Sequence, residues 1–449
     1  MPLIQRQLNG PVDLPRLQRQ RPSRYPLLLQ SVAGGNAQSR WDMLLIANGE
    51  GLALAHGETR DLNGQAIDLP FLDALDARFA ACRSELRHDV PFSGGWAVYL
   101  GYELAGQVEP TLRLPAFAGP LPDALALRCP AALLHDRETN AFIAVAEHGY
   151  EGLLDDMSHD IPPAAAAEGF PAWRGDVQVA EEEPGRFTRS VARILDYLNA
   201  GDVFQVNISR AWRGTSGHAD AHALYRRLCM LNPSPFAGLM RFADWSLISS
   251  SPERLVSVRG DVVQTRPIAG TRPRMPDDNE LDKIKELIGH PKERAEHVML
   301  IDLERNDLGR VCVPGSVHVD ELMSVESYRH VHHIVSNVSG RLVPDRTPGQ
   351  IIAAVFPGGT ITGCPKVRCM QIIAELEQTG RGPYTGALGY LNRNGSMDLN
   401  ILIRSLWLSE GRLELRAGAG IVVDSDPERE LQETRAKAKG LLRALGAAE

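Results

Sequence analysis

The chain has 449 residues, of which 43% are hydrophobic and 23% charged, which is ordinary for a soluble globular protein and long enough for one large core or for two or three domain-sized cores. A formal net charge of −8 argues against nucleic acid or an anionic membrane as the main partner, although a locally positive site can still bind a small anion. The N-terminus has no signal-peptide core, no run approaches a membrane span, and the six cysteines lack metal-ligand spacing. These features predict a cytoplasmic protein.

Composition divides the chain into two regions. Residues 1–157 mix short β-rich segments with helix and form a predicted N-terminal region. Residues 158–184 are rich in proline, alanine, glycine and acidic residues, which predicts a linker. The larger region, 185–445, holds the segments that carry chemistry, and no internal repeat is present.

The larger region opens with a predicted helix over 187–200, where apolar residues recur at helical spacing and Gly201 ends the pattern. The strand-like segment 201–209 follows and contains Gln205. A neutral amide can orient a nucleophile or a substrate group but cannot deprotonate water. The alternative is a hydrogen-bonded polar residue in a buried strand.

Three further segments combine polar side chains with glycine or an apolar strand. Residues 265–274 place the backbone N–H groups of Gly270 and Thr271 where they could approach a carboxylate. His333 lies in an apolar run, where histidine is more often a core residue than a catalyst. Residues 356–368 predict a glycine-rich loop that leads into a helix, and this loop is not a P-loop because the Gly-Lys-Ser/Thr ending is absent.

Two glutamate pairs, Glu293/Glu296 and Glu430/Glu433, each place two carboxylates on one face of a predicted helix. The second helix has a clear start, because Asp426 can cap its first turn. Four carboxylates from two helices, without sulfur ligands, suit a hard cation such as Mg²⁺, which binds few protein oxygens and keeps positions open for an anionic substrate. The alternative is that these glutamates are exposed and paired with basic neighbours.

The motifs between and around these pairs are long and ordered: GDVFQVNIS, SPERL, TRPIAGTRPR, ERAEHVMLIDLERNDLGRV, VHHIVS, FPGGTITGCPKVRCM and PERELQETRAKA. In these motifs the chain resembles the chorismate-using family of anthranilate synthase and aminodeoxychorismate synthase component I. The resemblance is densest from 187 to 440 and weaker over 25–110. It implies an α/β (α+β) fold in which two facing antiparallel sheets are surrounded by helices and enclose the active site.

The resemblance also implies roles for the polar residues. Glu296 and Glu433 would hold Mg²⁺ directly, and Glu293 and Glu430 would hold it through waters. The substrate chorismate is a dianion, and the positions that match its binding residues are Tyr384, Arg404, Gly270, Thr271, Gly418, Gly420 and Lys437. The positions that match catalytic residues are His333 as general acid and base, Thr360 near the leaving hydroxyl, Gln205, and Ala269. Gln205 stands where relatives that add water carry a lysine, so the resemblance favours ammonia as nucleophile.

Ammonia requires a source, and the sequence contains no Gly-x-Cys-x-Gly nucleophile elbow of a glutaminase. The resemblance therefore implies a separate glutamine amidotransferase subunit as partner in a heterodimer. A tryptophan bound in the N-terminal region is a further possibility that the family raises.

The family has two amination branches, and the residues divide between them. Ala269 and Thr360 match anthranilate synthase, whereas most aminodeoxychorismate synthases carry lysine in place of Ala269. Gln30, where anthranilate synthases typically carry a glutamate of the tryptophan feedback site, departs from that branch. Three scaffold segments resemble aminodeoxychorismate synthase: 39–42, 331–333 and 356–359.

We give the scaffold segments more weight and predict the aminodeoxychorismate synthase reaction of p-aminobenzoate and folate synthesis. Because Ala269 replaces the lysine nucleophile, the predicted route passes through noncovalent 2-amino-2-deoxyisochorismate. The alternatives are anthranilate synthase, which releases anthranilate and pyruvate, and a non-catalytic regulator that binds chorismate or tryptophan. The complete set of glutamates, together with His333 and Arg404, argues against the regulator.

Overall fold

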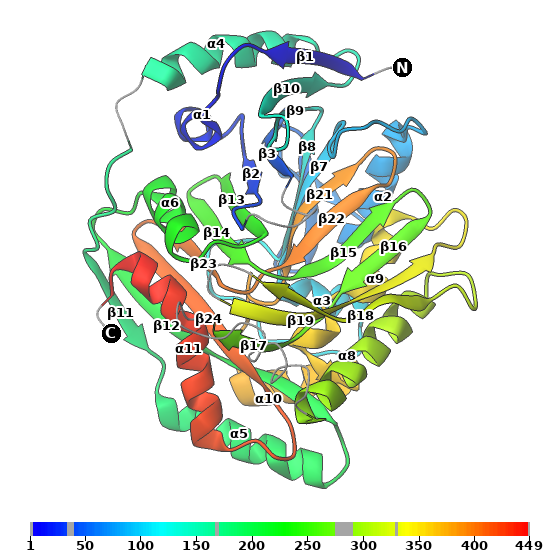
Figure 1. Ribbon diagram of the computed structural model, residues 1–449, viewed down its shortest axis with the longest axis vertical. Coiled ribbons are helices and arrows are strands. Elements are labelled where there is room, and N and C mark those ends of the chain that lie inside the picture. The colour runs from blue at the N-terminus through cyan, green and yellow to red at the C-terminus, as the bar shows by residue number, and fades with distance from the viewer. Residues whose placement is uncertain (1–2, 34–39, 167–169, 274–290, 328–330, 448–449) are drawn as a thin grey trace.

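The computed structural model describes residues 3–33, 40–166, 170–273, 291–327 and 331–447 (Figure 1). Within these residues two twelve-stranded sheets form the body of the protein, and every pair of neighbouring strands in them is antiparallel. The fold predicted from the resemblance is confirmed.

The first sheet runs, in spatial order, through β1 (Ile4–Leu8), β10 (Ala141–Ala146), β9 (Ala131–Asp136), β3 (Trp41–Ile46), β2 (Leu27–Gln30), β13 (Phe236–Phe242), β14 (Trp245–Ser251), β23 (Ser405–Ser409), β24 (Arg412–Ile421), β12 (Gln205–Ser216) and β11 (Val177–Glu181), with β20 (Gly363–Cys364) against β12. The second sheet runs through β17 (Ile268–Pro273), β19 (Val331–Arg341), β16 (Val262–Arg266), β15 (Arg254–Arg259), β22 (Met397–Ile401), β21 (Ala387–Asn392), β7 (Gly95–Leu100), β8 (Ala124–Cys129), β4 (Gly51–Ala55), β5 (Glu58–Asp61) and β6 (Ala66–Ile67), with β18 (His318–Ser327) against β19.

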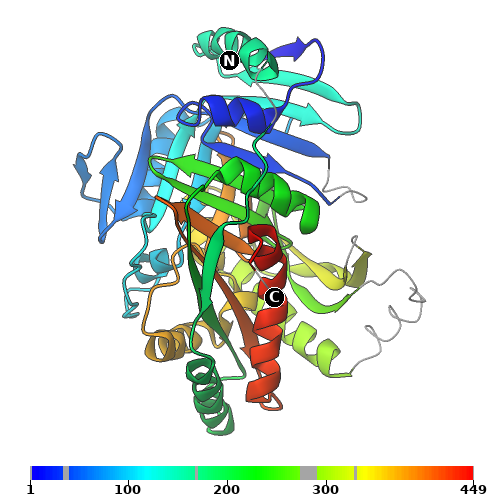
Figure 2. The ribbon, with the colours of Figure 1, turned by 90° about the vertical axis from the view of Figure 1, so that its left-hand side faces the viewer.

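The described helices are α1 (Leu14–Gln20), α2 (Phe71–Cys82), α3 (Ala105–Val108), α4 (Gly152–Ala166), α5 (Pro184–Asn199), α6 (Ala221–Leu231), α8 (Pro291–Gly309), α9 (Pro348–Val355), α10 (Lys366–Glu377) and α11 (Pro427–Leu445), with 3-10 turns η2 (Tyr102–Leu104) and η3 (Gly359–Ile361). Figure 2 shows α11 lying along the first sheet over β24. No described helix is both long and apolar enough to cross a membrane.

Apolar side chains between the sheets and on their outer faces hold the sheets and helices together. Between the sheets, residues such as Tyr99 and Leu127 meet Met240 and Trp245, and the Tyr99 and Trp245 rings lie 6.0 Å apart. Outside the first sheet, α1, α4, α6 and α11 cover a second core, and outside the second sheet α2 and α9 cover a third. Burial of this apolar area stabilises the packing of the described helices on the two sheets.

Both sheets combine strands from the predicted N-terminal and catalytic regions. In the first sheet β2 pairs with β13, and in the second β7 pairs with β21. The predicted linker at 158–184 is in part regular structure, because α4 continues to Ala166 and β11 pairs with β12. The prolines that favoured a linker lie inside α4, where burial of Leu154 and Met157 supports the helix.

Several predicted local elements are confirmed. The helix predicted over 187–200 is α5, and the strand that contains Gln205 is β12. Asp426 caps α11 by accepting the Arg429 N–H at 3.0 Å. The predicted helix that carries Glu293 and Glu296 is α8, which continues to Gly309 with Glu304 and Asp307 buried near its end.

Candidate functional site

The β12 and β24 strands form a polar wall in which glycines face amide side chains. Gln205 and Asn207 lie on one face of β12, and Asn207 pairs with Gly420 of β24. A Cβ atom at Gly420 would lie 2.4 Å from Gln205 Nε2, so only glycine allows this approach. The side-chain oxygens of Gln205 and Asn207 are buried and have no hydrogen-bond partner among the described residues. Buried polar atoms normally have partners, which marks this wall as a place where a ligand can bind.

Tyr384 closes the wall from a tight turn that follows α10. A Cβ atom at Gly418 would lie 2.6 Å from Tyr384 Oη and 2.9 Å from Asn207 Oδ1, so the tyrosine hydroxyl reaches the predicted glycine. Burial raises the pKa of Tyr384 to about 12, which keeps the hydroxyl protonated and able to donate a hydrogen bond. The next residue, Thr385, has a φ of +63°, a left-handed conformation that is rare for a β-branched residue and is found mostly where function requires it.

Glu253 and Thr360 form a hydrogen-bonded pair beside this wall. Glu253 is 5% exposed, and the Thr360 hydroxyl donates to its Oε1 at 2.8 Å. Burial raises the Glu253 pKa to about 7, although the Thr360 hydroxyl, the Ile268 N–H and the charges of Lys437 and Arg404 act to lower it. The carboxyl group is therefore in part protonated at neutral pH and can deliver a proton.

Lys437 and Arg404 lie near enough to Glu253 for their positive charges to act on its carboxyl group. Lys437 donates to the Gly418 carbonyl at 3.0 Å and pairs with Glu433 at 2.7 Å one helical turn earlier. Arg404 has a φ of +51°, and its carbonyl accepts the Ser250 N–H at 3.1 Å. The structure thus brings together seven of the predicted site residues, which are Gln205, Thr360, Tyr384, Arg404, Gly418, Gly420 and Lys437.

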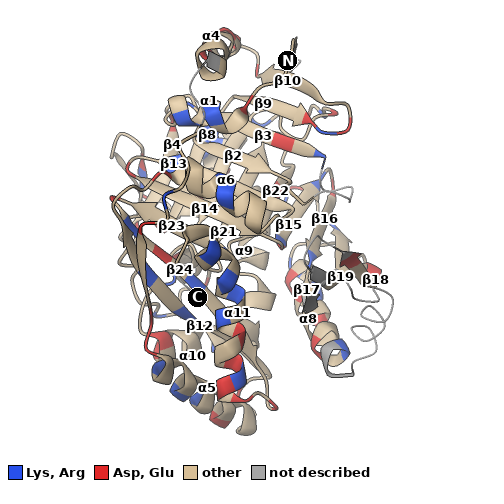
Figure 3. Ribbon diagram, turned by 60° about the vertical axis from the view of Figure 1, so that its left-hand side comes forward, with Lys and Arg blue, Asp and Glu red and all other residues tan. Residues whose placement is uncertain are grey.

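Apart from Glu430 and Glu433 of α11, the remaining predicted residues belong to β17, β19 and α8, which lie to one side of α11 and β24 in Figure 3. His333 is 2% exposed on β19, opposite Thr271 of β17 and Glu326 of β18. Ala269 and Gly270 lie on β17 with Thr271, but the side chains of this strand from Ala269 onward fall outside the described residues. The N–H of Ile268, the first residue of β17, donates to the Glu253 carboxyl group and so connects β17 to the Glu253–Thr360 pair.

The four predicted metal ligands lie in the first turns of two helices, α8 and α11. Glu296 and Glu430 are partly buried, Glu433 exposes 49% of its side chain, and the Glu293 side chain falls outside the described residues. Among the described side chains no three acidic, histidine or cysteine residues gather as a metal site. The donor set is made of carboxylate oxygens alone, which fits Mg²⁺ in kind. The ligand assignment stays a prediction.

Glu253 is a site residue that the sequence reasoning missed. Its motif, SPERL, was recognised, but a glutamate after proline at the end of a strand is indistinguishable in sequence from a surface residue. The structure reveals it by its position, because Glu253 lies between two strands, β14 and β15, that are buried almost throughout.

A cavity of about 510 Å³ lies between the sheets and is lined in part by Gln30, Ser31 and Met43. The Tyr225 hydroxyl donates to Gln30 Oε1 at 3.2 Å. The cavity therefore presents a neutral amide at the position where the resemblance places a glutamate in anthranilate synthases.

The sequence profile of the chorismate binding enzyme family matches residues 36–443, which is most of the chain. The chain belongs to this family. An anthranilate synthase component I-like protein of Synechocystis is 42% identical over 79% of this chain and 73% of its own length. Aminodeoxychorismate synthase component 1 of Bacillus subtilis is 40% identical, and the match spans 84% of this chain and 83% of that protein.

Among solved structures, anthranilate synthase component I of Streptococcus pneumoniae superimposes with a TM-score of 0.81 and 32% identity, covering 91% of this chain and 93% of that one. The chain is thus a chorismate-utilising enzyme of the anthranilate synthase component I type. Relatives carry the names of both amination branches.

Proposed function

We propose that the enzyme converts chorismate and ammonia to 4-amino-4-deoxychorismate, the aminodeoxychorismate synthase reaction of p-aminobenzoate and folate synthesis. The observation that carries an amination is the wall at Gln205. The buried Gln205 amide oxygen, which has no hydrogen-bond partner within the described part of the chain, can accept a hydrogen bond from ammonia but cannot take a proton from water. A glutamine amidotransferase subunit in the cytoplasm would supply the ammonia.

The first chemical step joins ammonia nitrogen to C2 of the ring. The ring double bonds shift by one position each, the C4–O bond breaks, and the departing hydroxyl takes a proton to leave as water. Glu253 accepts a hydrogen bond from the Thr360 hydroxyl, and its buried carboxyl group has a pKa of about 7. Glu253 is therefore suited to supply that proton. His333 is suited to remove the proton that the new ammonium group must lose.

The second step follows from Ala269. Because alanine offers no amine to attack C2, a second ammonia joins C4 directly, the double bonds shift back, and the C2–N bond breaks to release the first ammonia. The intermediate is 2-amino-2-deoxyisochorismate held without a covalent bond to the protein. Appearance of a covalent adduct in the mass spectrum of the enzyme during turnover would contradict this route.

Binding of the two substrate carboxylates draws on the rest of the wall. Tyr384 and Arg404 would hold the enolpyruvyl carboxylate, the Gly270, Thr271, Gly418 and Gly420 backbone would allow close approach of the substrate, and Lys437 would add positive charge. Mg²⁺, when bound by Glu296 and Glu433 with Glu293 and Glu430 outside them, would neutralise the ring carboxylate and stabilise charge at the leaving oxygen.

Gln30 supports the folate branch over tryptophan synthesis. An amino-acid effector carries an ammonium group, and a carboxylate binds that group more strongly than an amide does. The neutral Gln30, already bonded to Tyr225, is poorly suited to tryptophan feedback. Tryptophan as a ligand of this cavity therefore stays a weaker proposal than the amination itself.

Product identity tests the proposal. The purified chain is incubated with chorismate, Mg²⁺ and ammonium, and the products are separated with and without added aminodeoxychorismate lyase. We expect p-aminobenzoate to form only when the lyase is present. Anthranilate and pyruvate formed without the lyase would overturn the assignment.

Anthranilate synthase is the second candidate, and Ala269 and Thr360 favour it. Both residues match the anthranilate branch, and the Streptococcus pneumoniae neighbour carries that name. If anthranilate is the product, these two residues outweigh the scaffold segments.

A further inference from the structure

Every side-chain N–H group of Arg381 has a hydrogen-bond acceptor within the described structure, although the sequence predicts no role for this residue. It lies in the turn between α10 and Tyr384 and is 1% exposed. A guanidinium group has five N–H donors, and here all five have acceptors. The acceptors are Glu377 Oε2 at 3.0 Å, Glu377 Oε1 at 2.6 Å, the Asn207 carbonyl at 2.7 Å, Thr385 Oγ1 at 3.3 Å and the Ile361 carbonyl at 3.4 Å.

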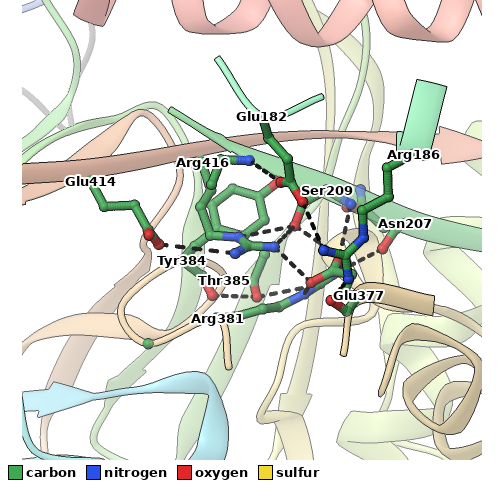
Figure 4. Close-up of polar contacts among 12 residues, drawn as sticks. Glu182, Arg186, Asn207, Ser209, Glu377, Arg381, Tyr384, Thr385, Glu414 and Arg416 are labelled. Carbon is green, nitrogen blue, oxygen red and sulfur yellow. Dashed lines mark hydrogen bonds and ion pairs between the residues drawn. The ribbon is translucent and has the colours of Figure 1, made fainter. Parts of the chain in front are cut away.

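Three of the acceptor residues lie on segments that carry a predicted site residue. Asn207 is two residues from Gln205 on β12, Ile361 follows Thr360, and Thr385 follows Tyr384. Figure 4 shows the Arg381 side chain reaching Asn207, Thr385 and Glu377 from one position. One rigid, planar group therefore spans three chain segments that are far apart in sequence.

Glu377 extends the cluster to the fourth segment. It accepts the Ser209 N–H and hydroxyl at 2.8 Å each on β12, and it accepts Arg416 Nη2 of β24 at 2.9 Å. Arg416 is two residues before Gly418. Glu377 and Arg416 are 5% and 3% exposed, so no water competes for these bonds.

The backbone of the turn is fixed from the opposite side by the N-terminal region. Glu103 accepts the Arg381 N–H at 2.7 Å and the Gly382 N–H at 3.0 Å. The Tyr102 ring faces the guanidinium group at 4.9 Å, and the Tyr384 ring faces it at 5.6 Å. Such cation–π contacts add stabilisation in a desolvated setting. The turn is held through both its backbone and its side chain.

We propose that Arg381 is a positioning residue of the chorismate site, which aligns the strand of Gln205, the loop of Thr360 and the turn of Tyr384 and, through Glu377, the strand of Gly418. The inference rests on the proposed role of these four residues in binding and converting chorismate. All five Arg381 donors are used within the protein, which leaves none for a substrate. Its effect on the reaction comes from the relative placement of groups that do.

The test replaces Arg381 by lysine, which keeps the charge opposite Glu377 but cannot reach five acceptors from one nitrogen atom. Misplacement of site residues by about 1 Å typically lowers the rate by about 10²-fold. We expect kcat/KM for chorismate to fall by about that factor, through a lower kcat and a higher KM, because Arg381 holds segments that carry residues for binding and for chemistry. Chorismate disappearance is the readout, so the result does not depend on which amino product forms.

A matched control separates positioning from stability. Arg128 forms a buried pair with Glu147, at 8% and 4% exposure, and also faces an aromatic ring, but it lies away from the predicted site residues. Arg128→Lys should lower the melting temperature to a comparable degree and leave kcat/KM unchanged. If Arg381→Lys likewise loses stability while its kcat/KM stays within twofold of the parent enzyme, Arg381 is a structural residue and the proposal is wrong.

Thr385→Gly tests the same idea if Arg381→Lys does not fold. Glycine accepts the φ of +63° without strain, so the backbone keeps its conformation. The change removes the hydroxyl that accepts from Arg381 and donates to the Tyr384 carbonyl at 2.5 Å. We expect a folded enzyme with a several-fold higher KM for chorismate, whereas His56→Gly, at a φ of +53° in the β4–β5 turn, should leave KM unchanged. An unchanged KM in Thr385→Gly would overturn the proposal.

The two proposals fail in distinguishable ways. If the parent enzyme makes anthranilate, the proposed product is wrong, but the comparison of chorismate kinetics between Arg381→Lys and Arg128→Lys keeps its meaning. If the parent enzyme makes 4-amino-4-deoxychorismate and the two variants behave alike, the product assignment stands and Arg381 loses its positioning role.

Discussion

Two carboxylates, Glu253 and Glu377, are buried to the same degree, at 5% exposure each, and yet their environments differ. Glu377 lies between Arg381 and Arg416 and also accepts two hydrogen bonds from Ser209. Glu253 has no ion pair within hydrogen-bond reach among the described residues, and its side-chain partner is the neutral Thr360 hydroxyl.

The difference appears in their proton affinities. Burial alone raises the pKa of both, but in Glu377 the two guanidinium groups outweigh burial and the pKa falls below its ordinary value. In Glu253 burial prevails, and the pKa rises to about 7. The partners, more than the depth of burial, decide whether a carboxylate serves as a permanent anion in the framework or as a proton donor.

The largest effect is expected for a third kind of carboxylate, which is neither buried nor framed by arginine. Glu433 exposes 49% of its side chain, so Glu433→Gln should leave the fold intact, and Glu296→Gln makes the matching change at the partly buried ligand on α8. Both should abolish Mg²⁺-dependent turnover, measured as chorismate consumption across a Mg²⁺ titration. Glu428→Gln, exposed on the same helix, is the control and should retain activity. Full activity in Glu433→Gln would remove the metal assignment.

Glu253→Gln should lower turnover by about 10²–10⁴-fold, the usual loss when a general acid is removed. Glutamine preserves the acceptor for the Thr360 hydroxyl, so the free energy of unfolding at neutral pH should not fall. Steady-state kinetics and urea unfolding of the same preparation check both parts. A variant that unfolds more easily but keeps its turnover would assign Glu253 to the framework with Glu377.

Glu377→Gln should show the opposite profile. Removal of the anion leaves two buried guanidinium groups without their counter-charge, and breaking a buried ion pair in this way typically costs about 3–5 kcal/mol. Urea unfolding measures the loss of unfolding free energy. If Glu377→Gln lost turnover without losing stability, Glu377 would be the proton donor and not a structural anion.

The smallest effect is a pH dependence of stability specific to Glu253. Its pKa is 4.5 in an unfolded reference and about 7 in the fold, so between these values the folded state holds a proton that the unfolded chain releases. The contribution to stability is complete below pH 4.5 and is lost as pH rises through about 7. The unfolding free energy of the parent enzyme should therefore decline across this window relative to Glu253→Gln. Parallel profiles would show that the carboxyl is ionised throughout.

The sequence predicted the elements whose signals are local. Asp426 at the start of α11 and Gly201 after α5 act within one helical turn, so their pattern can be seen without tertiary structure. Motif resemblance placed Gln205, Tyr384 and Gly418, which the structure brings to one wall.

What the sequence concealed depends on burial. Glu377 and Arg381 are four residues apart, a spacing that is common for exposed helix pairs, and nothing local shows that both are enclosed by strands from elsewhere in the chain. Pro162 and Pro163 favour a linker by composition, whereas packing of α4 on the first sheet decides the outcome. Glu253 can be recognised as a candidate proton donor only when its burial and its neighbours are both known.

The interleaving of the two sheets has a consequence for synthesis of the protein. When the first 150 residues have left the ribosome, β7 and β2 exist, but their partners β21 and β13 have not been made. The N-terminal third therefore has unpaired strand edges, and that of β7 stays unpaired until residues beyond 390 have been synthesised. Such long-range pairing slows folding and exposes edges that invite aggregation. Expression of this enzyme should accordingly depend on chaperones and on temperature more than its ordinary composition indicates.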